Sequence, residues 1–403
     1  MKPRGVILLL AALALAAKLY CAATTFGTAD VNLFWEFGRI IQSHGLIHMY
    51  LATALFNHTP LMGWFAAFCH WLATEGGDGS AFNFYLRLPA IFADFGTVLT
   101  LVWLKQKTGK PAWWAIGLLA VSPVSFMVSG FHGNVDPLMV FCLALAAAAC
   151  VAERPVWCGV FLAASCNVKV VPIFLVPAFL FYWWHRGRVV RFSLPAAGLM
   201  LAGWSLPLCS IPIVFLKDVF GYSSYWGMWG VTYGLRLTNH PALREMGFTD
   251  ASATHQIIAQ ILKAIVVIAV LAVAWRRRKV EPLGIFTTLA LSWTIFFVLA
   301  PGFGAQYLVW LAPFYLVAAE GWYAALTIAS TIGLTVYYTA SCNGAIPWNF
   351  AQNPNRGIAT SSPWLVLTWL VLVLFLAKTV RDLLSRTPPE AETESLVEPA
   401  IEA

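Results

Sequence analysis

The sequence predicts an all-α, polytopic helical membrane protein with about twelve transmembrane helices and long external loops. Of its 403 residues, 60% are hydrophobic and 11% are charged, and the mean hydropathy is +0.74. Apolar stretches of about 13–21 residues recur along the chain, and the longer ones can cross the hydrocarbon layer as helices. Only helices and closed barrels satisfy the backbone in lipid, and these stretches lack the alternation of barrel strands. The composition therefore excludes an ordinary soluble domain.

Twelve apolar segments are expected to span the membrane. The first, residues 6–23, follows a basic N-terminus and is interpreted as a retained span, with a cleaved signal peptide as the alternative. The remaining spans are expected near residues 88–104, 112–130, 137–152, 156–168, 170–184, 192–212, 256–275, 282–300, 306–319, 322–340 and 363–379.

The distribution of Lys and Arg predicts the orientation of these spans. Most of the 25 basic residues lie at the two termini and in the loops at 105–110, 153–154, 185–191 and 276–279, which are therefore expected to be cytoplasmic. Residues 1–386 then form one domain with long external loops at 24–87, 213–255 and 341–362. The acidic tail, residues 387–403, is expected to be disordered.

One apolar segment, residues 60–73, does not fit as a span. Counting it would place the lysine-rich loop at 105–110 outside the cell. A length of about 14 residues suits an interfacial or re-entrant helix better. We therefore expect it to lie on the membrane within the loop at 24–87.

Several classes of site are disfavoured by what the sequence lacks. The eight cysteines include no Cys-x-x-Cys pair and no metal-ligand spacing, and most lie in apolar runs. The chain has no Asp-x-Asp motif and no glycine-rich phosphate loop, which disfavours a nucleotide-sugar donor. The net charge of +7 is explained by topology and does not indicate nucleic acid as a partner. Neither a metal nor a cofactor is expected.

A few acidic residues lie close to the predicted spans. Asp30 and Asp136 fall on the external side, where each could cap a helix or face a common cavity. Asp94 lies inside a span and is expected to pair with Lys18 or Lys169, with a proton relay as the alternative. Glu36 is expected on a polar helix surface, paired with Arg39 three residues later.

Seven short motifs follow one another in an order typical of one enzyme family. They are Asp30 in the first external loop, GLIHMY at 45–50, NHTPL at 57–61, LRLP at 86–89 followed by Asp94, FHGNVD at 131–136, NVKVVP at 167–172 and GAQYLVWLAP at 304–313. Over residues 1–320 the chain resembles the GT-C integral-membrane glycosyltransferases, in particular bacterial relatives of the polyprenyl-phosphate-mannose-dependent mannosyltransferases related to the GPI mannosyltransferases. It departs from their pattern at 132–134, where relatives often carry Trp-Gly-Gln, and at 59–60, where one proline replaces two.

The resemblance implies an inverting hexosyltransferase. It would move a sugar, mannose by resemblance, from a polyprenyl-phosphate donor to a hydroxyl of a glycolipid, glycan or protein acceptor. The resemblance implies a bacterial inner membrane, with the site facing the periplasm or exterior. Asp30 is the candidate catalytic base. The candidate substrate-binding residues are Tyr50, His58, Arg87, His132, Asn134, Asp136, Lys169, Trp229, Gln306 and Tyr307, with Arg236 as a further candidate.

Several of these residues could instead have purely structural roles. Arg87 could anchor a helix at the interface, Lys169 could pair with Asp94, and Trp229 could belong to an interfacial aromatic belt. Two alternative functions also fit the composition. A transporter or flippase of lipid-linked sugars would use Asp94, Lys169 and Lys18 as a relay, but no inverted repeat is visible. A polysaccharide polymerase or ligase would share the lipid-linked substrates.

Overall fold

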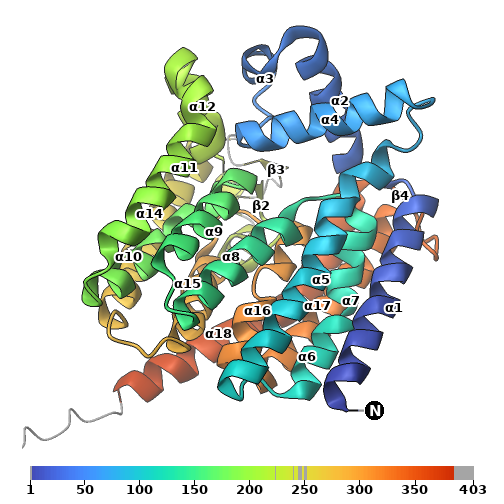
Figure 1. The fold of residues 1–403 in the computed structure, drawn as a ribbon. Coiled ribbons are helices and arrows are strands. Elements are labelled where there is room, and N and C mark those ends of the chain that lie inside the picture. The colour runs from blue at the N-terminus through green and yellow to red at the C-terminus, as the bar shows by residue number, and fades with distance from the viewer. Residues whose placement is uncertain (1, 223, 239, 244–246, 249–251, 385–403) are drawn as a thin grey trace, which may run out of the picture.

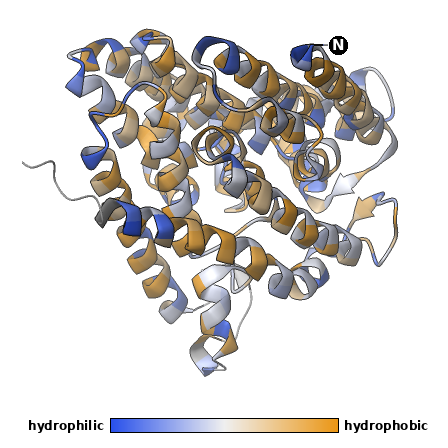
Figure 2. Ribbon diagram, turned by 90° about the horizontal axis from the view of Figure 1, so that it is seen from below, coloured by the Kyte–Doolittle hydropathy of each residue, from blue (hydrophilic) through white to orange (hydrophobic). Residues whose placement is uncertain are grey.

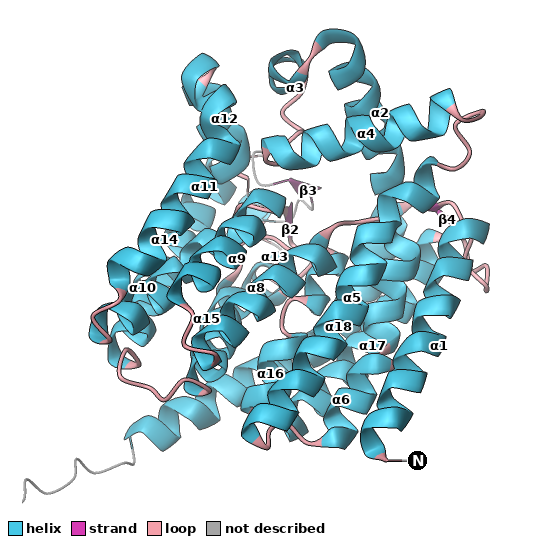
Figure 3. Ribbon diagram, in the orientation of Figure 1, coloured by secondary structure: helices cyan, strands magenta, loops and turns pink. Residues whose placement is uncertain are grey.

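The computed structural model describes residues 2–222, 224–238, 240–243, 247–248 and 252–384, and these are almost entirely helical (Figures 1 and 3). The expected disordered tail at 387–403 and Arg244, one of the external basic residues, lie outside the described residues. The all-α prediction for the membrane domain is confirmed.

Six described helices are long and apolar enough to cross a membrane. They are α1 (Pro3–Thr24), α5 (Phe82–Thr108), the continuous segment Trp113–His132, α11 (Val189–Ser210), α14 (Ala253–Arg276) and the segment Pro354–Asp382 of α18 (Pro354–Leu384). The segment Trp113–His132 contains α6 (Trp113–Ala120), α7 (Pro123–Ser125) and the π-helix η1 (Phe126–His132). The chain is thus a helical membrane protein, while the predicted number of twelve spans is not confirmed.

Shorter apolar helices and one further long helix complete the bundle. They are α8 (Asp136–Val151), α9 (Pro155–Val168), η2 (Val171–Leu175), α10 (Val176–His185), α15 (Gly284–Leu299), η5 (Ala305–Val309), α16 (Ala312–Ala318) and α17 (Glu320–Ser341). The most extensive packing joins α17 to α18 and α9 to both α8 and α11. Hydrophobic residues predominate along these helices, and many of the most hydrophilic residues lie near the helix ends (Figure 2). Large exposed side chains such as Leu194, Ile268 and Ile328 suit contact with lipid.

Three helices from the long loop at 24–87 cover one end of the bundle. They are α2 (Ala29–His44), α3 (Leu46–Ala52) and α4 (Pro60–Glu75), and α4 lies across the other helices in Figure 1. The predicted helix at 60–73 is confirmed as α4. On α2, Arg39 pairs with Glu36 at 2.7 Å, as predicted.

Small elements outside the bundle connect distant loops at this same end. The strand β1 (Gly27–Thr28) pairs in parallel with β4 (Phe350–Ala351), and β2 (Tyr225–Trp226) pairs antiparallel with β3 (Gly247–Phe248). The remaining short helices are α12 (Pro212–Phe215), η3 (Leu216–Phe220), α13 (Gly230–Leu237) and η4 (Pro241–Leu243). The three loops predicted to be external therefore meet at one end of the molecule.

The loops predicted to be cytoplasmic meet at the opposite end. Arg186 donates a hydrogen bond to the carbonyl of Val280 at 2.8 Å, and Arg188 lies 3.7 Å from the carboxylate of Glu153. The start of α1 and the end of α18 lie at this end too (Figure 1). These loops and the two helix ends therefore lie at the end of the bundle opposite α2–α4.

Candidate functional site

Asp30 lies in the first turn of α2, where the chain enters the end covered by α2–α4. Thr28 caps this helix, because its side chain accepts a hydrogen bond from the Asp30 amide at 3.3 Å. The same hydroxyl donates to the carbonyl of His132 at 2.7 Å and so fixes the start of α2 against η1. Thr28, and not Asp30, is the capping residue, which leaves the Asp30 carboxylate available for other contacts.

Two side chains hold the Asp30 carboxylate. His132 Nε2 and Asn134 Nδ2 each lie 3.1 Å from Asp30 Oδ2. No described residue hydrogen-bonds to Oδ1, and the side chain is 32% exposed. One carboxylate oxygen is thus fixed, and the other can accept a proton or a hydrogen bond.

Tyr338 extends this chain of hydrogen bonds behind His132. Its hydroxyl lies 2.7 Å from His132 Nδ1, and both side chains are buried. Because an ionised carboxylate only accepts, His132 Nε2 must carry a hydrogen and donate it to Asp30. The hydrogen bond between Tyr338 and Nδ1 therefore fixes the orientation of the ring that faces Asp30.

Hydrogen bonding decides the charge of Asp30. Burial by itself raises the pKa of this carboxyl group, but the hydrogen bonds and charge of His132, together with Asn134, outweigh burial and lower the pKa to about 2. Asp30 is therefore ionised at neutral pH.

The turn after His132 requires glycine. Gly133 has a φ of +86°, and a Cβ at this position would lie 2.5 Å from a methyl group of Val31. The close approach brings Asn134 next to α2, where its amide nitrogen reaches Asp30 while its oxygen accepts from the Asp136 amide at 3.1 Å. Asn134 thus connects the two aspartates.

Asp136 is completely buried and fully paired. Its carboxylate binds Lys169 Nζ at 2.7 Å through Oδ1 and the indole N–H of Trp310 at 2.8 Å through Oδ2. The alternative that Lys169 pairs with Asp94 is wrong. Asp94 instead pairs with Lys18 at 2.7 Å, which confirms the other predicted partner.

Lys169 lies in the break between α9 and η2, and its ammonium group is surrounded by aromatic rings. Nζ is 4.6 Å from the centre of the Tyr307 ring and 5.0 Å from that of Trp310. Its bond to Asp136 uses one of three ammonium hydrogens. Two donors therefore remain for a ligand.

A cavity of about 130 Å³ joins these groups. It is lined by Asp30, Leu33, Phe34, Phe37, Leu55, Asn57, His58, Asn134, Lys169, Tyr222, Gln306 and Tyr307. Six of the residues singled out from the sequence are thus brought together here: Asp30, His58, Asn134, Lys169, Gln306 and Tyr307. His132 and Asp136 lie directly behind Asp30 and Lys169.

His58 enters this cavity as a neutral group. Burial, reinforced by the charge of Lys169, lowers its pKa to about 3, against the opposing effect of Asp30. Its buried Nδ1 has no hydrogen-bond partner among the described residues. A neutral imidazole with an unpaired nitrogen is suited to a hydroxyl group of a ligand.

Three predicted binding residues belong to the framework and do not line the cavity. The first, Arg87, is completely buried and donates to the carbonyls of Thr25, Phe26 and Gly130. It therefore holds the chain between α1 and α2 in place.

Trp229 and Tyr50 are the other two. Trp229 donates to the Phe297 carbonyl at 2.6 Å and stacks on Phe303 with the ring centres 4.1 Å apart. Tyr50 donates to the His58 carbonyl at 2.8 Å, so it positions the backbone of a cavity residue from behind. Arg236, the further candidate, lies on α13 and its guanidinium group is 5.1 Å from the centre of the Tyr233 ring.

Tyr338 is a contact of the site that the sequence patterns did not indicate. It follows Tyr337 near the end of α17, inside a segment interpreted only as a span. A pair of tyrosines at the predicted external end of a span is the signal that could have indicated it. No protein-family model matches the chain, and no curated protein is significantly similar to it.

Proposed function

We propose that the protein is an inverting glycosyltransferase that uses a polyprenyl-phosphate sugar, with mannose as the sugar that the resemblance favours. The observation that carries the proposal is the Asp30 carboxylate, which has one oxygen held by His132 and Asn134 and the other without a partner among the described residues. It shares a cavity with Lys169, whose ammonium group has hydrogens that no described residue accepts. A base and a cation that line one small cavity suit attack on a sugar with a phosphate leaving group.

In the proposed reaction, the acceptor hydroxyl attacks the anomeric carbon of the donor. The new C–O bond forms as the bond from that carbon to the phosphate oxygen breaks, and the bonding electrons leave with the phosphate. The hydroxyl proton passes to Asp30 Oδ1. Because the phosphate departs as an anion, no acid is needed to protonate it, and Lys169 compensates part of its charge.

A pKa of about 2 makes Asp30 a weak base. Such a base suits a transition state in which the leaving group has largely departed, because the attacking hydroxyl is then strongly acidic. His132 and Asn134 fix the direction of the carboxylate, so that proximity compensates for weak basicity.

The proposed location of the site is the external face of a bacterial inner membrane. The basic loops at 105–110 and 276–279 support this orientation under the positive-inside rule, because the cavity lies at the opposite end of the bundle. A lipid-linked donor fits this face, and the acceptor would be a glycolipid, a glycan or a protein.

The test is direct incubation of the purified protein with defined polyprenyl-phosphate hexoses and candidate acceptors. Mass spectrometry would score release of polyprenyl phosphate together with the glycosylated product. Loss of both in Asp30→Asn, with donor binding retained, is the expected result. Transport of the intact lipid-linked sugar that depends on Asp94 and not on Asp30 would replace this proposal with the transporter.

A further inference from the structure

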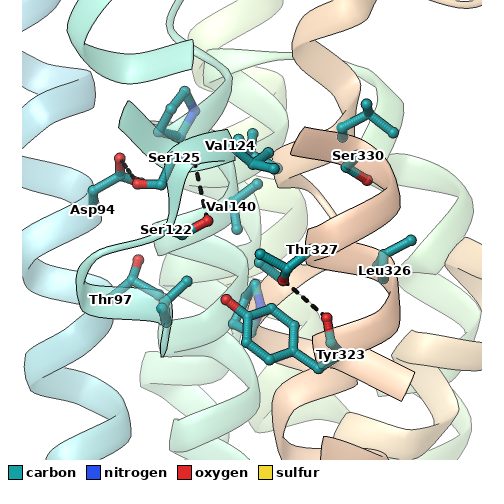
Figure 4. Close-up of a pocket in the computed structure, with 16 residues that line it drawn as sticks. Asp94, Thr97, Ser122, Val124, Ser125, Val140, Tyr323, Leu326, Thr327 and Ser330 are labelled. Carbon is teal, nitrogen blue, oxygen red and sulfur yellow. Dashed lines mark hydrogen bonds between the residues drawn. The ribbon is translucent and has the colours of Figure 1, made fainter. Parts of the chain in front are cut away.

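A second polar cavity lies inside the helix bundle, away from the proposed active site. It has a volume of about 30 Å³ and is enclosed by α5, the junction of α6 and α7, the start of α8, the segment η5–α16 and α17 (Figure 4). Seven of its sixteen lining residues carry a hydroxyl or carboxyl group: Asp94, Thr97, Ser122, Ser125, Tyr323, Thr327 and Ser330. Such a concentration of polar groups is unusual inside a membrane domain.

Two hydroxyl groups at this cavity have no hydrogen-bond partner among the described residues. They belong to Tyr323 and Ser330, which are 2% and 1% exposed, and both lie on α17. In Figure 4, Ser330 lies on the opposite side of the cavity from Asp94, and the Tyr323 ring extends across toward Ser122 and Thr97. A buried hydroxyl without a hydrogen bond is costly, and here the adjoining cavity has room for a molecule that satisfies both groups.

The remaining polar groups leave acceptors available. Asp94 receives Lys18 at 2.7 Å and the Ser125 hydroxyl at 2.5 Å, both on Oδ2, so no described residue bonds to Oδ1. Among the described residues, Ser122 accepts a long hydrogen bond from the Ser125 amide, at 3.4 Å, and lies near the Tyr323 hydroxyl, so its oxygen can take a second donor. The cavity therefore offers both donors and acceptors on facing helices.

The charge of the cavity favours a neutral occupant. Asp94 is balanced by Lys18, whose ammonium group is buried against it. A metal cation would add a charge without a counter-ion in a region of low dielectric constant. Water needs about 10–15 Å³ and two to four polar partners, and both conditions are met here.

We propose that this cavity holds one or two ordered water molecules that connect Tyr323 and Ser330 on α17 to Asp94 and Ser122. The site braces two elements that reach the proposed active site. The helix η1 begins directly after Ser125 and ends at His132, and α17 also carries Tyr338. Binding of these waters requires only the hydroxyl groups and the cavity, and it is independent of the proposed glycosyl transfer.

The test uses the full chain with Ser330→Ala, Tyr323→Phe and the double variant, followed by thermal unfolding in detergent. If water is bound, each single change removes one of its partners and lowers the unfolding midpoint by about 1–3 °C. The double variant should lose at least as much as either single variant, because both hydroxyls that hold the water are then gone. A dry cavity gives the opposite sign, since deleting an unpaired buried hydroxyl is stabilising.

Ser361→Ala provides the matched control. Ser361 is also completely buried, with a hydroxyl that has no partner among the described residues, but it lies on α18 and does not line this cavity. The unfolding midpoint of Ser361→Ala should equal or exceed that of the unmodified protein. The proposal is overturned if Ser330→Ala and Tyr323→Phe behave like Ser361→Ala. It is also overturned if replacing choline by sodium in the buffer stabilises the protein and Asp94→Asn abolishes that stabilisation, because the cavity would then bind a cation.

Discussion

Asp30 and Asp136 lie at the same end of the molecule and are bridged by Asn134, yet their surroundings are opposite. Asp136 is completely buried, and both of its oxygens are occupied by Lys169 and Trp310. Asp30 is 32% exposed, and only one of its oxygens is bound, by His132 and Asn134. The Asp136 carboxylate is part of the framework, and the Asp30 carboxylate is available for chemistry.

Two identical side chains can thus serve one site in different ways. A carboxylate neutralised by a buried ion pair sets the position of its cation, which is here the ammonium group in the cavity. A carboxylate held by hydrogen-bond donors keeps its charge and an open oxygen. The division of roles comes from the partners and not from the distance to the membrane.

The largest expected effect is on stability, from Asp136→Asn. This change leaves the buried ammonium group of Lys169 without its counter-ion, and breaking a buried pair costs about 3–5 kcal/mol. Unfolding in detergent, followed by tryptophan fluorescence, should show a large loss. By contrast, Asp30→Asn should lower the stability less, because the Asp30 side chain is 32% exposed and is held by hydrogen bonds and not by a buried ion pair.

A double variant separates the ion pair from the individual charges. Asp136→Asn combined with Lys169→Met removes both charges, so much of the lost stability should return. Affinity for the lipid-phosphate donor should nevertheless stay low, because the cation is gone. Normal donor affinity in a stable double variant would contradict the role of Lys169.

A smaller effect is expected from Tyr338→Phe. It removes the hydrogen bond to His132 Nδ1, worth about 1 kcal/mol, and so loosens the orientation of the imidazole ring. The transfer rate should fall roughly fivefold with the KM for the donor unchanged. Tyr85→Phe, on α5 and outside the cavity, is the control and should keep the full rate.

The ionisation of Asp30 should make the stability of the fold depend on pH only under acid conditions. The pKa of Asp30 in the folded protein is about 2, below the value of about 3.9 for a free aspartate, so its ionised form stabilises the fold above pH 4. That contribution is lost as the pH falls from about 4 through 2. His58, with a pKa of about 3, also stays neutral above pH 5.

Removing one hydrogen bond should raise the acid limit. In Asn134→Ala the pKa of Asp30 should move up toward that of a free aspartate, because one of the donors that lower it is gone. In the unmodified protein, kcat/KM should therefore stay constant toward the acid end of a profile from pH 4 to 8. In the variant, kcat/KM should begin to fall at a higher pH. Identical profiles would argue against Asp30 as the base.

The smallest effect is expected from Glu36→Gln. Glu36 lies on the same helix as Asp30 but pairs with Arg39 on the exposed surface, where such pairs contribute less than about 0.5 kcal/mol. Both stability and transfer should stay close to normal in thermal unfolding and turnover assays. A strong loss of turnover would extend the site to the outer face of α2.

The features that depend on local pattern and chain order could be predicted from the sequence. Basic loops identified the two ends of the bundle, and the short apolar segment at 60–73 forms the separate helix α4. The motif order also brought together Asp30, Asn134 and Lys169, which do line one cavity. The GT-C identity and the roles of these residues stay predictions.

Contacts made by the folded chain could not be predicted from local patterns. Arg87 belongs to the LRLP motif, but its guanidinium group points inward and donates to the backbone carbonyls of the loop at 25–26, which need a hydrogen-bond donor there. The sequence offered only Asp94 as an acidic partner for Lys169, and the packing of α9 against α8 places Lys169 beside Asp136 instead. In the sequence, nothing distinguishes Tyr338 from other tyrosines at the end of a span. Its contact follows from the fold, in which η1 places His132 beside it.

The most direct measurement compares turnover in Asp30→Asn with that in Glu36→Gln, using a polyprenyl-phosphate hexose and its acceptor. We predict that Asp30→Asn lowers the transfer rate by about 10²–10⁴-fold while the protein stays folded and still binds the donor, whereas Glu36→Gln keeps its rate. Transfer by Asp30→Asn at a rate near that of the unmodified protein would contradict the assignment of Asp30 as the catalytic base.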